Sequence, residues 1–250
     1  MTEAMAKSAT MSRFMGVVYH DLMWFVGLFG LAVGSFLNVL IDRLPQGKNV
    51  ITGRSQCDYC GKTLRWFELV PLLSFFIQRG RCRRCHNKLS WQYPIVELVT
   101  AVAFAYGANP LVFSSLLVIF VADLKYQIIP DSMVVMGVIG VIGVIGEKNV
   151  ASGFGAAAFF LLLWLVTRGK GMGLGDVKLA FLMGLLLGFP NIIIASYLAF
   201  LTGAASGVIL ILLGKKKLKE KIAFGPFLVA GTVIALIWGE QLLTVWRRLL

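Results

Sequence analysis

A series of apolar runs separated by short polar segments constrains the fold of this chain more than any other feature. The runs fall at about 14–41, 94–108, 110–123, 131–146, 152–167, 177–189, 191–213 and 224–246. With 58% hydrophobic residues and a mean hydropathy of +0.82, the composition lies outside the range of ordinary soluble domains. We therefore expect an all-α polytopic membrane protein, a bundle of about eight transmembrane helices surrounded by the lipid bilayer.

Two of the runs, 110–123 and 177–189, are shorter than the ~20 residues that cross a normal bilayer. Either they are buried within the bundle where the lipid thins, or one of them is re-entrant. We favour burial, because a re-entrant segment would reverse every later connection and move the lysine-rich run 215–221 to the outside.

The net charge of +12 follows the connections between the runs rather than forming one patch. Segment 42–93 alone holds ten Lys or Arg against three Asp or Glu. Basic connections face the cytoplasm, so this distribution places 42–93 inside and the amino terminus outside, and it argues against a nucleic-acid partner.

The same pattern divides the chain into three parts. Residues 1–41 form an amino-terminal segment and the first transmembrane helix, which is too long for a secretory h-region and ends before Pro45. Residues 42–93 form a soluble cytoplasmic insertion, and residues 94–250 form a seven-helix membrane domain.

Two carboxylates, Asp123 and Asp176, stand at the edges of apolar runs, where acids are rare and usually functional. In the predicted topology both lie at the cytoplasmic face. Two carboxylates about 3 Å apart in a low-dielectric site share one proton. The ionised member can then activate water while the protonated member polarises a carbonyl group. We expect Asp176, which begins its helix, to be the anion, and Asp123, which ends its helix, to carry the proton.

Other interpretations of these acids stay open. Asp176 caps its helix in one of them, and Asp123 pairs with Lys125 or Lys178 in another. A non-enzymatic membrane protein could also use both acids as an ion or proton relay. The glycines that precede Asp176, in Gly171–Lys178, leave room for the backbone of an extended substrate.

Four cysteines form two Cys-x-x-Cys pairs within the basic insertion: Cys57, Cys60, Cys82 and Cys85. A basic insertion is cytoplasmic, where thiols stay reduced, so the pairs favour a metal over disulfides. Two such pairs can ligate structural Zn²⁺ in a zinc-ribbon-like module, and a segment of about 50 residues has little core of its own. His86 is a possible but less favoured ligand.

Several segments together resemble the prepilin peptidases, or type IV leader peptidases, which are membrane aspartic proteases with a Gly-x-Gly-Asp motif. The segments that carry the resemblance are Gly34–Pro45, Trp66–Glu97, Asp123–Asp131, Gly171–Lys178 and Phe224–Leu228. The sequence departs from the family pattern at Asp42, Glu68, His86 and Ala223.

The resemblance implies a bifunctional enzyme of the bacterial cytoplasmic (inner) membrane. Such an enzyme removes the leader of type IV prepilins or type II secretion pseudopilins with an aspartate dyad, here Asp123 and Asp176. It then methylates the new amino terminus with S-adenosylmethionine. Glu97 is a candidate for the cofactor site, and packing or an internal salt bridge is its other interpretation.

Two alternatives remain at this stage. The chain is a peptidase without methyltransferase activity, or it is a non-enzymatic ion or proton carrier whose zinc module docks a partner. The sequence predicts neither the oligomeric state nor the pilus or secretion system that supplies the substrate.

Overall fold

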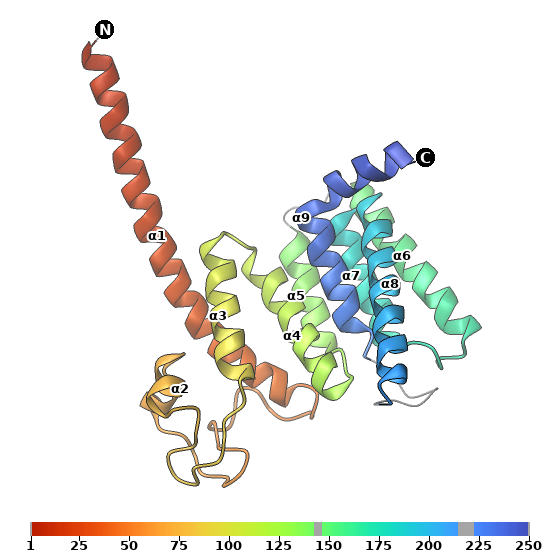
Figure 1. The fold of residues 1–250 in the computed structure, drawn as a ribbon, viewed down its shortest axis with the longest axis horizontal. Coiled ribbons are helices and arrows are strands. Elements are labelled where there is room, and N and C mark those ends of the chain that lie inside the picture. Colours follow the sequence, from red (N-terminus) through yellow and green to blue (C-terminus); the bar gives the residue numbers. More distant parts are fainter. Residues whose placement is uncertain (1, 143–146, 215–222, 250) are drawn as a thin grey trace. The chain divides into compact units, whose positions relative to one another are not determined.

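In a computed structural model, the described residues outside the insertion lie mostly in helices joined by short connections (Figure 1). The structure describes the backbone of residues 2–142, 147–214 and 223–249, and the side chains of 23–142, 149–214 and 223–244. The elements are α1 (Thr2–Arg43), η1 (Trp66–Leu69), α2 (Leu73–Ile77), α3 (Gln92–Ala105), α4 (Pro110–Tyr126), α5 (Asp131–Ile142), α6 (Glu147–Val166), α7 (Leu174–Leu187), α8 (Asn191–Leu212) and α9 (Gly225–Leu249). The lysine-rich run 215–221 lies outside the described residues.

Each predicted apolar run coincides largely with one helix, which confirms an all-helical membrane protein. Among the described residues, four segments are long and apolar enough to cross a bilayer alone: Met23–Arg43, Asn149–Val166, Asn191–Leu212 and Gly225–Thr244. The helices α3, α4, α5 and α7 are shorter, so the number of about eight spans stays a prediction.

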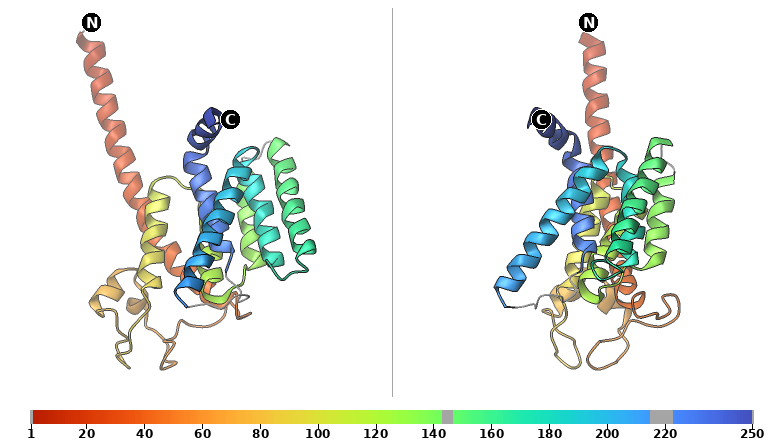
Figure 2. Two further views of the ribbon diagram at one scale, coloured as in Figure 1. Left: turned by 45° about the vertical axis from the view of Figure 1, so that its right-hand side comes forward. Right: turned by 90° about the vertical axis from the view of Figure 1, so that its right-hand side faces the viewer.

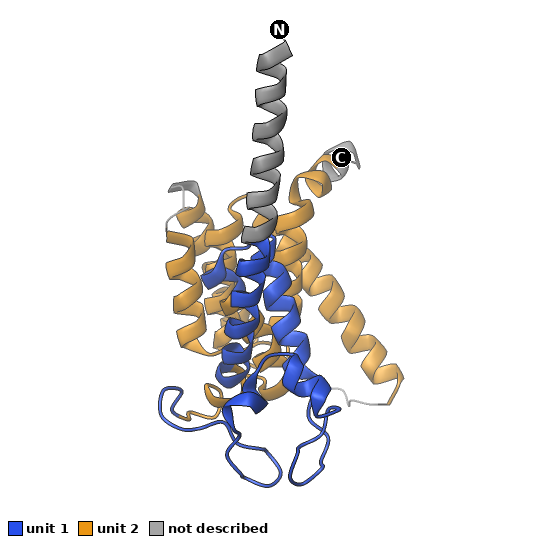
Figure 3. Cartoon of the chain, turned by 90° about the vertical axis from the view of Figure 1, so that its left-hand side faces the viewer, with its two compact units in different colours: residues 1–40, 49–113 blue, residues 41–48, 114–250 orange. Residues whose placement is uncertain are grey.

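Contacts group the helices into two compact units, which Figure 3 colours separately. Unit 1 comprises residues 1–40 and 49–113, and unit 2 comprises residues 41–48 and 114–250. In unit 1, α1 packs closely on α3, because a Cβ at Gly34 would lie 2.7 Å from the Cα of Glu97. Asn38 of α1 is buried and donates a hydrogen bond to the carbonyl of Tyr93, so polar contacts reinforce this packing.

The insertion of unit 1 contains little regular structure beyond η1 and α2. Two isolated β-bridges, Gln56 with Thr63 and Arg81 with Lys88, each close a tight loop around one Cys-x-x-Cys pair. The second loop places His86 at a φ of +58°, where the first loop has Gly61 at +66°. The two loops are therefore copies of one knuckle, built once with glycine and once with histidine.

In unit 2, the short helix α7 is the central element and contacts α5, α6, α8 and α9 (Figure 2). Eight of its fourteen residues are buried, among them Leu179, Leu182 and Met183. The backbones of α6 and α7 meet at small residues, because a Cβ at Gly184 would lie 2.6 Å from the Cα of Gly153. Neighbouring helices cover α7, which accounts for an apolar helix too short to span alone.

Candidate functional site

Asp123 lies in the last turn of α4, with only 5% of its surface exposed. Its Oδ2 accepts a hydrogen bond of 2.9 Å from the backbone N–H of Gly225, the first residue of α9. A Cβ at Gly225 would lie 2.7 Å from this oxygen, so the contact requires glycine there. The start of a helix stabilises a negative charge, whereas the end of a helix does not. The start of α9 therefore stabilises the ionised form of Asp123, which the end of α4 would disfavour.

Asp176 lies in the first turn of α7 and is 6% exposed. Its Oδ2 accepts a hydrogen bond of 2.8 Å from the N–H of Gly173, the residue that caps the helix. Asp176 therefore caps its helix, as the alternative interpretation of the sequence expected. Capping occupies one oxygen and leaves the other for chemistry.

Both aspartates belong to unit 2, and both are buried at helix ends. Within the described part of the chain, the Oδ1 atom of each accepts no hydrogen bond. Two carboxyls that are each held by one oxygen can, when they meet, share a proton and orient a water molecule with the other oxygen. Because each one accepts a hydrogen bond from the start of a helix, helix dipoles no longer separate acid from base. That assignment stays a prediction.

The lysines that were alternative partners of the dyad are engaged with other acids. The Nζ of Lys125 lies 2.6 Å from Asp42, and the Nζ of Lys178 lies 2.7 Å from Asp131. The second pair joins the first residue of α5 to the first turns of α7. These contacts fix the helix ends around the aspartates.

The glycines before Asp176 differ in what they contribute. A Cβ at Gly175 would lie 3.0 Å from the Cβ of Ile129, so tight packing favours glycine at that position. Gly173 has a φ of −88°, and its nearest neighbour for a Cβ is 3.7 Å away. Neither backbone nor packing explains Gly173, which is consistent with an open approach for a substrate backbone.

The four predicted metal ligands come together in unit 1. The sulfurs of Cys57, Cys60, Cys82 and Cys85 all lie within 4.8 Å of one another. The Cys57 and Cys85 sulfurs are 3.8 Å apart. A tetrahedral zinc with Zn–S bonds of about 2.3 Å needs sulfurs about 3.8 Å apart, so this cluster fits the ion. His86 is not one of the clustered groups found in the described chain.

The electrostatics of the cluster also favour a cation. Hydrogen bonds from the backbone N–H groups of Cys85 and Arg84 lower the pKa of the Cys82 thiol to about 7. The backbone N–H of Asn87 favours the Cys85 thiolate, but desolvation and the neighbouring thiols raise the pKa of Cys85 to about 11. The Cys82 thiol therefore ionises readily, and its negative charge disfavours ionisation of a second thiol. A bound metal ion would relieve that repulsion.

Glu97, the predicted cofactor residue, is buried in α3 with 6% exposure. It accepts a hydrogen bond of 2.8 Å from the backbone N–H of Leu72, which precedes α2. Leu72 has a φ of +57°, a strained value for a leucine. Glu97 thus anchors the insertion to α3, and its part in cofactor binding stays a prediction.

Two backbone donors that hold the carboxylates were missed from the sequence, Gly225 and Leu72. A signal existed for the first, because proline at position 226 favours a helix start with free N–H groups at that point. The sequence carried no comparable signal for Leu72.

Comparison with known proteins agrees with this arrangement. The family model described as the bacterial Peptidase A24 N-terminal domain matches residues 28–109. The model of the type IV leader peptidase family matches residues 110–208. The junction between the two models falls close to the boundary between unit 1 and the main part of unit 2.

Curated relatives match over most of their length. A prepilin leader peptidase/N-methyltransferase of Bacillus subtilis is 33% identical over 89% of this chain and 96% of its own. Proteins of the same name from Aeromonas hydrophila and Pseudomonas aeruginosa are 34% and 32% identical, over 91% and 86% of this chain and 95% and 90% of their own. No solved structure matches significantly. With both domains matched in order and these identities along nearly the whole length, the chain belongs to the type IV leader peptidase family.

Proposed function

We propose that this chain is a prepilin peptidase that removes the leader of type IV prepilins or pseudopilins, with Asp123 and Asp176 as its catalytic pair. The names of its relatives support the reaction class. The observation that carries the proposal is the placement of the pair: two buried carboxyls of unit 2 lie at helix ends, and each is anchored by a backbone N–H through one oxygen.

The chemistry follows from that geometry. One carboxylate takes a proton from a water molecule, which attacks the scissile carbonyl, and the protonated partner donates a hydrogen bond to the carbonyl oxygen. The proton then passes to the leaving nitrogen. The N–H groups of Gly173 and Gly225 keep both carboxyls oriented during these steps.

A methyltransferase activity is the second part of the proposal, supported by the names of the same relatives. S-adenosylmethionine would supply the methyl group. The clustered cysteines would bind Zn²⁺ as a structural ion and give the insertion a defined shape. Glu97 would contribute to this activity by holding the insertion on α3.

The proposed setting is the bacterial inner membrane, with the amino terminus outside and both activities at the cytoplasmic face. The charge distribution of the sequence supports this orientation. A site at a membrane edge suits a substrate with a soluble leader and an apolar helix. The ion-carrier alternative expects acids deep within spans, whereas Asp123 and Asp176 lie at helix ends.

The peptidase is tested by co-expressing a prepilin with Asp123→Asn or Asp176→Asn and following leader removal on a gel. Each change should lower cleavage by about 10³-fold or more, because asparagine can neither accept nor release the proton. Glu240→Gln is the matched control, since Glu240 is an exposed acid of α9 outside the first turn, which holds Asp123. Normal cleavage in either dyad variant would eliminate the catalytic pair.

Methylation has its own readout. Mass spectrometry of the mature pilin should find the amino terminus one methyl group heavier when the wild-type enzyme is present. An unmodified terminus after complete cleavage would leave only the peptidase.

A further inference from the structure

Between positions 66 and 77 of the insertion, six large apolar side chains of η1, of α2 and of the residue that follows η1 are exposed. These residues, here named the apolar strip, are Trp66, Leu69, Val70, Leu73, Phe76 and Ile77. Trp66 is 79% exposed and Ile77 is 74% exposed, while Phe75 is buried in the same segment. Several exposed large apolar side chains gathered in one short segment of a small module indicate an interaction site.

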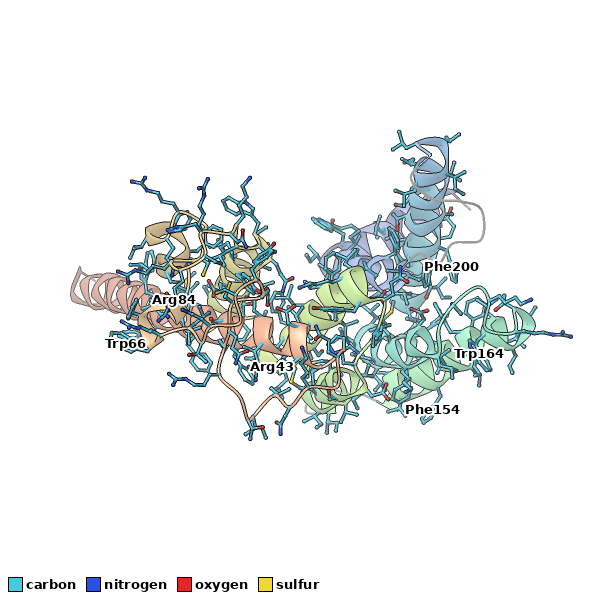
Figure 4. All side chains as sticks on the ribbon, turned by 90° about the horizontal axis from the view of Figure 1, so that it is seen from below. Arg43, Trp66, Arg84, Phe154, Trp164 and Phe200 are labelled. Carbon is cyan, nitrogen blue, oxygen red and sulfur yellow. The ribbon has the colours of Figure 1, made fainter. Side chains whose placement is uncertain are left out.

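A cavity of about 740 Å³ adjoins the strip. This cavity is here named the arginine pocket. Its lining includes Phe67, Ser74, Ile77, Arg79, Arg81 and Arg83. Ile77 belongs to both surfaces, so pocket and strip are continuous. Figure 4 marks Trp66 and Arg84 on this module, where nitrogen-tipped side chains extend away from the ribbon.

The charges of the arginine pocket are not neutralised by acids. In the described part of the chain, the ion pairs join Lys125 to Asp42 and Lys178 to Asp131, and none involves a pocket arginine. Glu68, the nearest acid in the sequence, accepts the backbone N–H of Arg65. The guanidinium of Arg83 lies 5.5 Å from the ring centre of Phe67, which holds it at the pocket wall.

We propose that the apolar strip and the arginine pocket dock on an anionic phospholipid surface, with a headgroup phosphate bound by the arginines and the strip inserted at the acyl boundary. Arginine suits phosphate because its planar fork donates two hydrogen bonds at once. Tryptophan and aliphatic residues beside basic residues are typical of segments that lie in the membrane interface.

Chain connectivity places the module beside a bilayer. The insertion follows directly from α1, whose segment Met23–Arg43 is long and apolar enough to span, and it leads directly into the apolar helix α3. A tether at both ends favours a lipid surface over a soluble partner, since docking then costs little entropy of association. The docked module would be held flat against the membrane at a fixed height.

The test uses the full chain in nanodiscs of phosphatidylcholine alone or mixed with phosphatidylglycerol, with backbone hydrogen exchange of residues 66–84 as the readout. Exchange in the wild type should be at least about tenfold slower with the anionic lipid, because each arginine gains attraction to the charged surface. The triple variant Arg79→Gln, Arg81→Gln, Arg83→Gln should lose this difference.

The matched control is Lys62→Gln, Arg65→Gln, Lys88→Gln, which removes the same charge from the same module outside the pocket and should keep most of the protection. Phe76→Ser with Ile77→Ser tests the strip without altering charge and should also abolish protection, and the metal content of every variant reports whether the insertion folds. Equal protection in both lipids, equal loss in the control, or the same protection from inorganic phosphate added to phosphatidylcholine discs would overturn the proposal. Protection that requires an added prepilin would overturn it as well.

Discussion

The acids of unit 2 and the thiols of unit 1 are held in place by different kinds of structure. Asp123 and Asp176 sit on helices of a packed bundle, and each accepts a backbone N–H at the start of a helix. The four cysteines sit on two short knuckles closed by single β-bridges, in an insertion with little helix. Helix packing positions the first site, whereas the second needs a bound ion to hold its loops together.

Removing the metal should therefore unfold the insertion and leave the aspartate site of unit 2 intact. This is the largest effect that we expect. After chelation of the full chain in detergent, residues 44–91 should become sensitive to protease, because structural zinc supplies about 10 kcal/mol or more of folding free energy in small modules. The helices of unit 2 should stay protected, and prepilin cleavage should persist while methylation is lost.

Adding Zn²⁺ back should restore protection, and Mg²⁺ should not, since magnesium prefers oxygen ligands. Cys82→Ser should reproduce the chelated state without a chelator. An insertion that resists protease equally well after its metal content has fallen to zero would contradict the comparison.

The sequence predicted the components of both sites better than their contacts. Apolar runs located the helices, and the spacing of the cysteines predicted a cluster, because both signals are local. The bond between Gly225 and Asp123 joins residues 102 positions apart, and that between Leu72 and Glu97 joins residues 25 apart. A backbone N–H has no side-chain signature, so only tertiary packing decides which carboxylate it meets.

The second prediction tests how tightly helix packing holds Asp123. Gly225→Ala should lower prepilin cleavage by about ten- to a hundredfold, because a Cβ 2.7 Å from the Asp123 Oδ2 must displace the carboxyl. Leader removal over time in membranes gives the rate.

Gly239→Ala is the matched control for this change. It lies on the same helix, and its Cβ would meet the Oδ1 of Asn191 at 2.8 Å, so the steric overlap is similar but far from the dyad along α9. The midpoint temperature of thermal unfolding should fall by a similar amount in both variants, whereas the cleavage rate should fall only in Gly225→Ala. Equal cleavage in the two variants would remove Gly225 from the positioning of Asp123.

Glu97 is a buried acid of unit 1 that, like Asp123 and Asp176 in unit 2, accepts a hydrogen bond from a backbone N–H. Glu97→Ala should destabilise the segment around α2 by about 1–3 kcal/mol, because the Leu72 N–H loses its acceptor. Glu97→Gln should cost about 1 kcal/mol, since the amide oxygen can still accept. Hydrogen exchange of residues 70–78 gives both values.

Thr100→Val is the control, because the Thr100 hydroxyl is buried on the same helix but donates to the carbonyl of Val96 rather than to the insertion. It should leave exchange at 70–78 unchanged. If Glu97→Gln abolished methylation of the mature pilin while exchange stayed at the wild-type rate, Glu97 would act on the cofactor rather than as an anchor.

The smallest expected effect compares the two knuckles, which differ at their left-handed position. Gly61 has a φ of +66° and open space where a methyl group would be added, so Gly61→Ala should weaken zinc retention by about 1 kcal/mol of backbone strain alone. His86→Gly relieves the same strain at a φ of +58° but adds freedom to the unfolded chain, so the two changes nearly cancel and retention should stay within about threefold of wild type. Competition of the full chain with a chromogenic chelator measures both. A tenfold loss in His86→Gly would mean that the imidazole contributes to the metal site, and the second knuckle would then be more than a strained copy of the first.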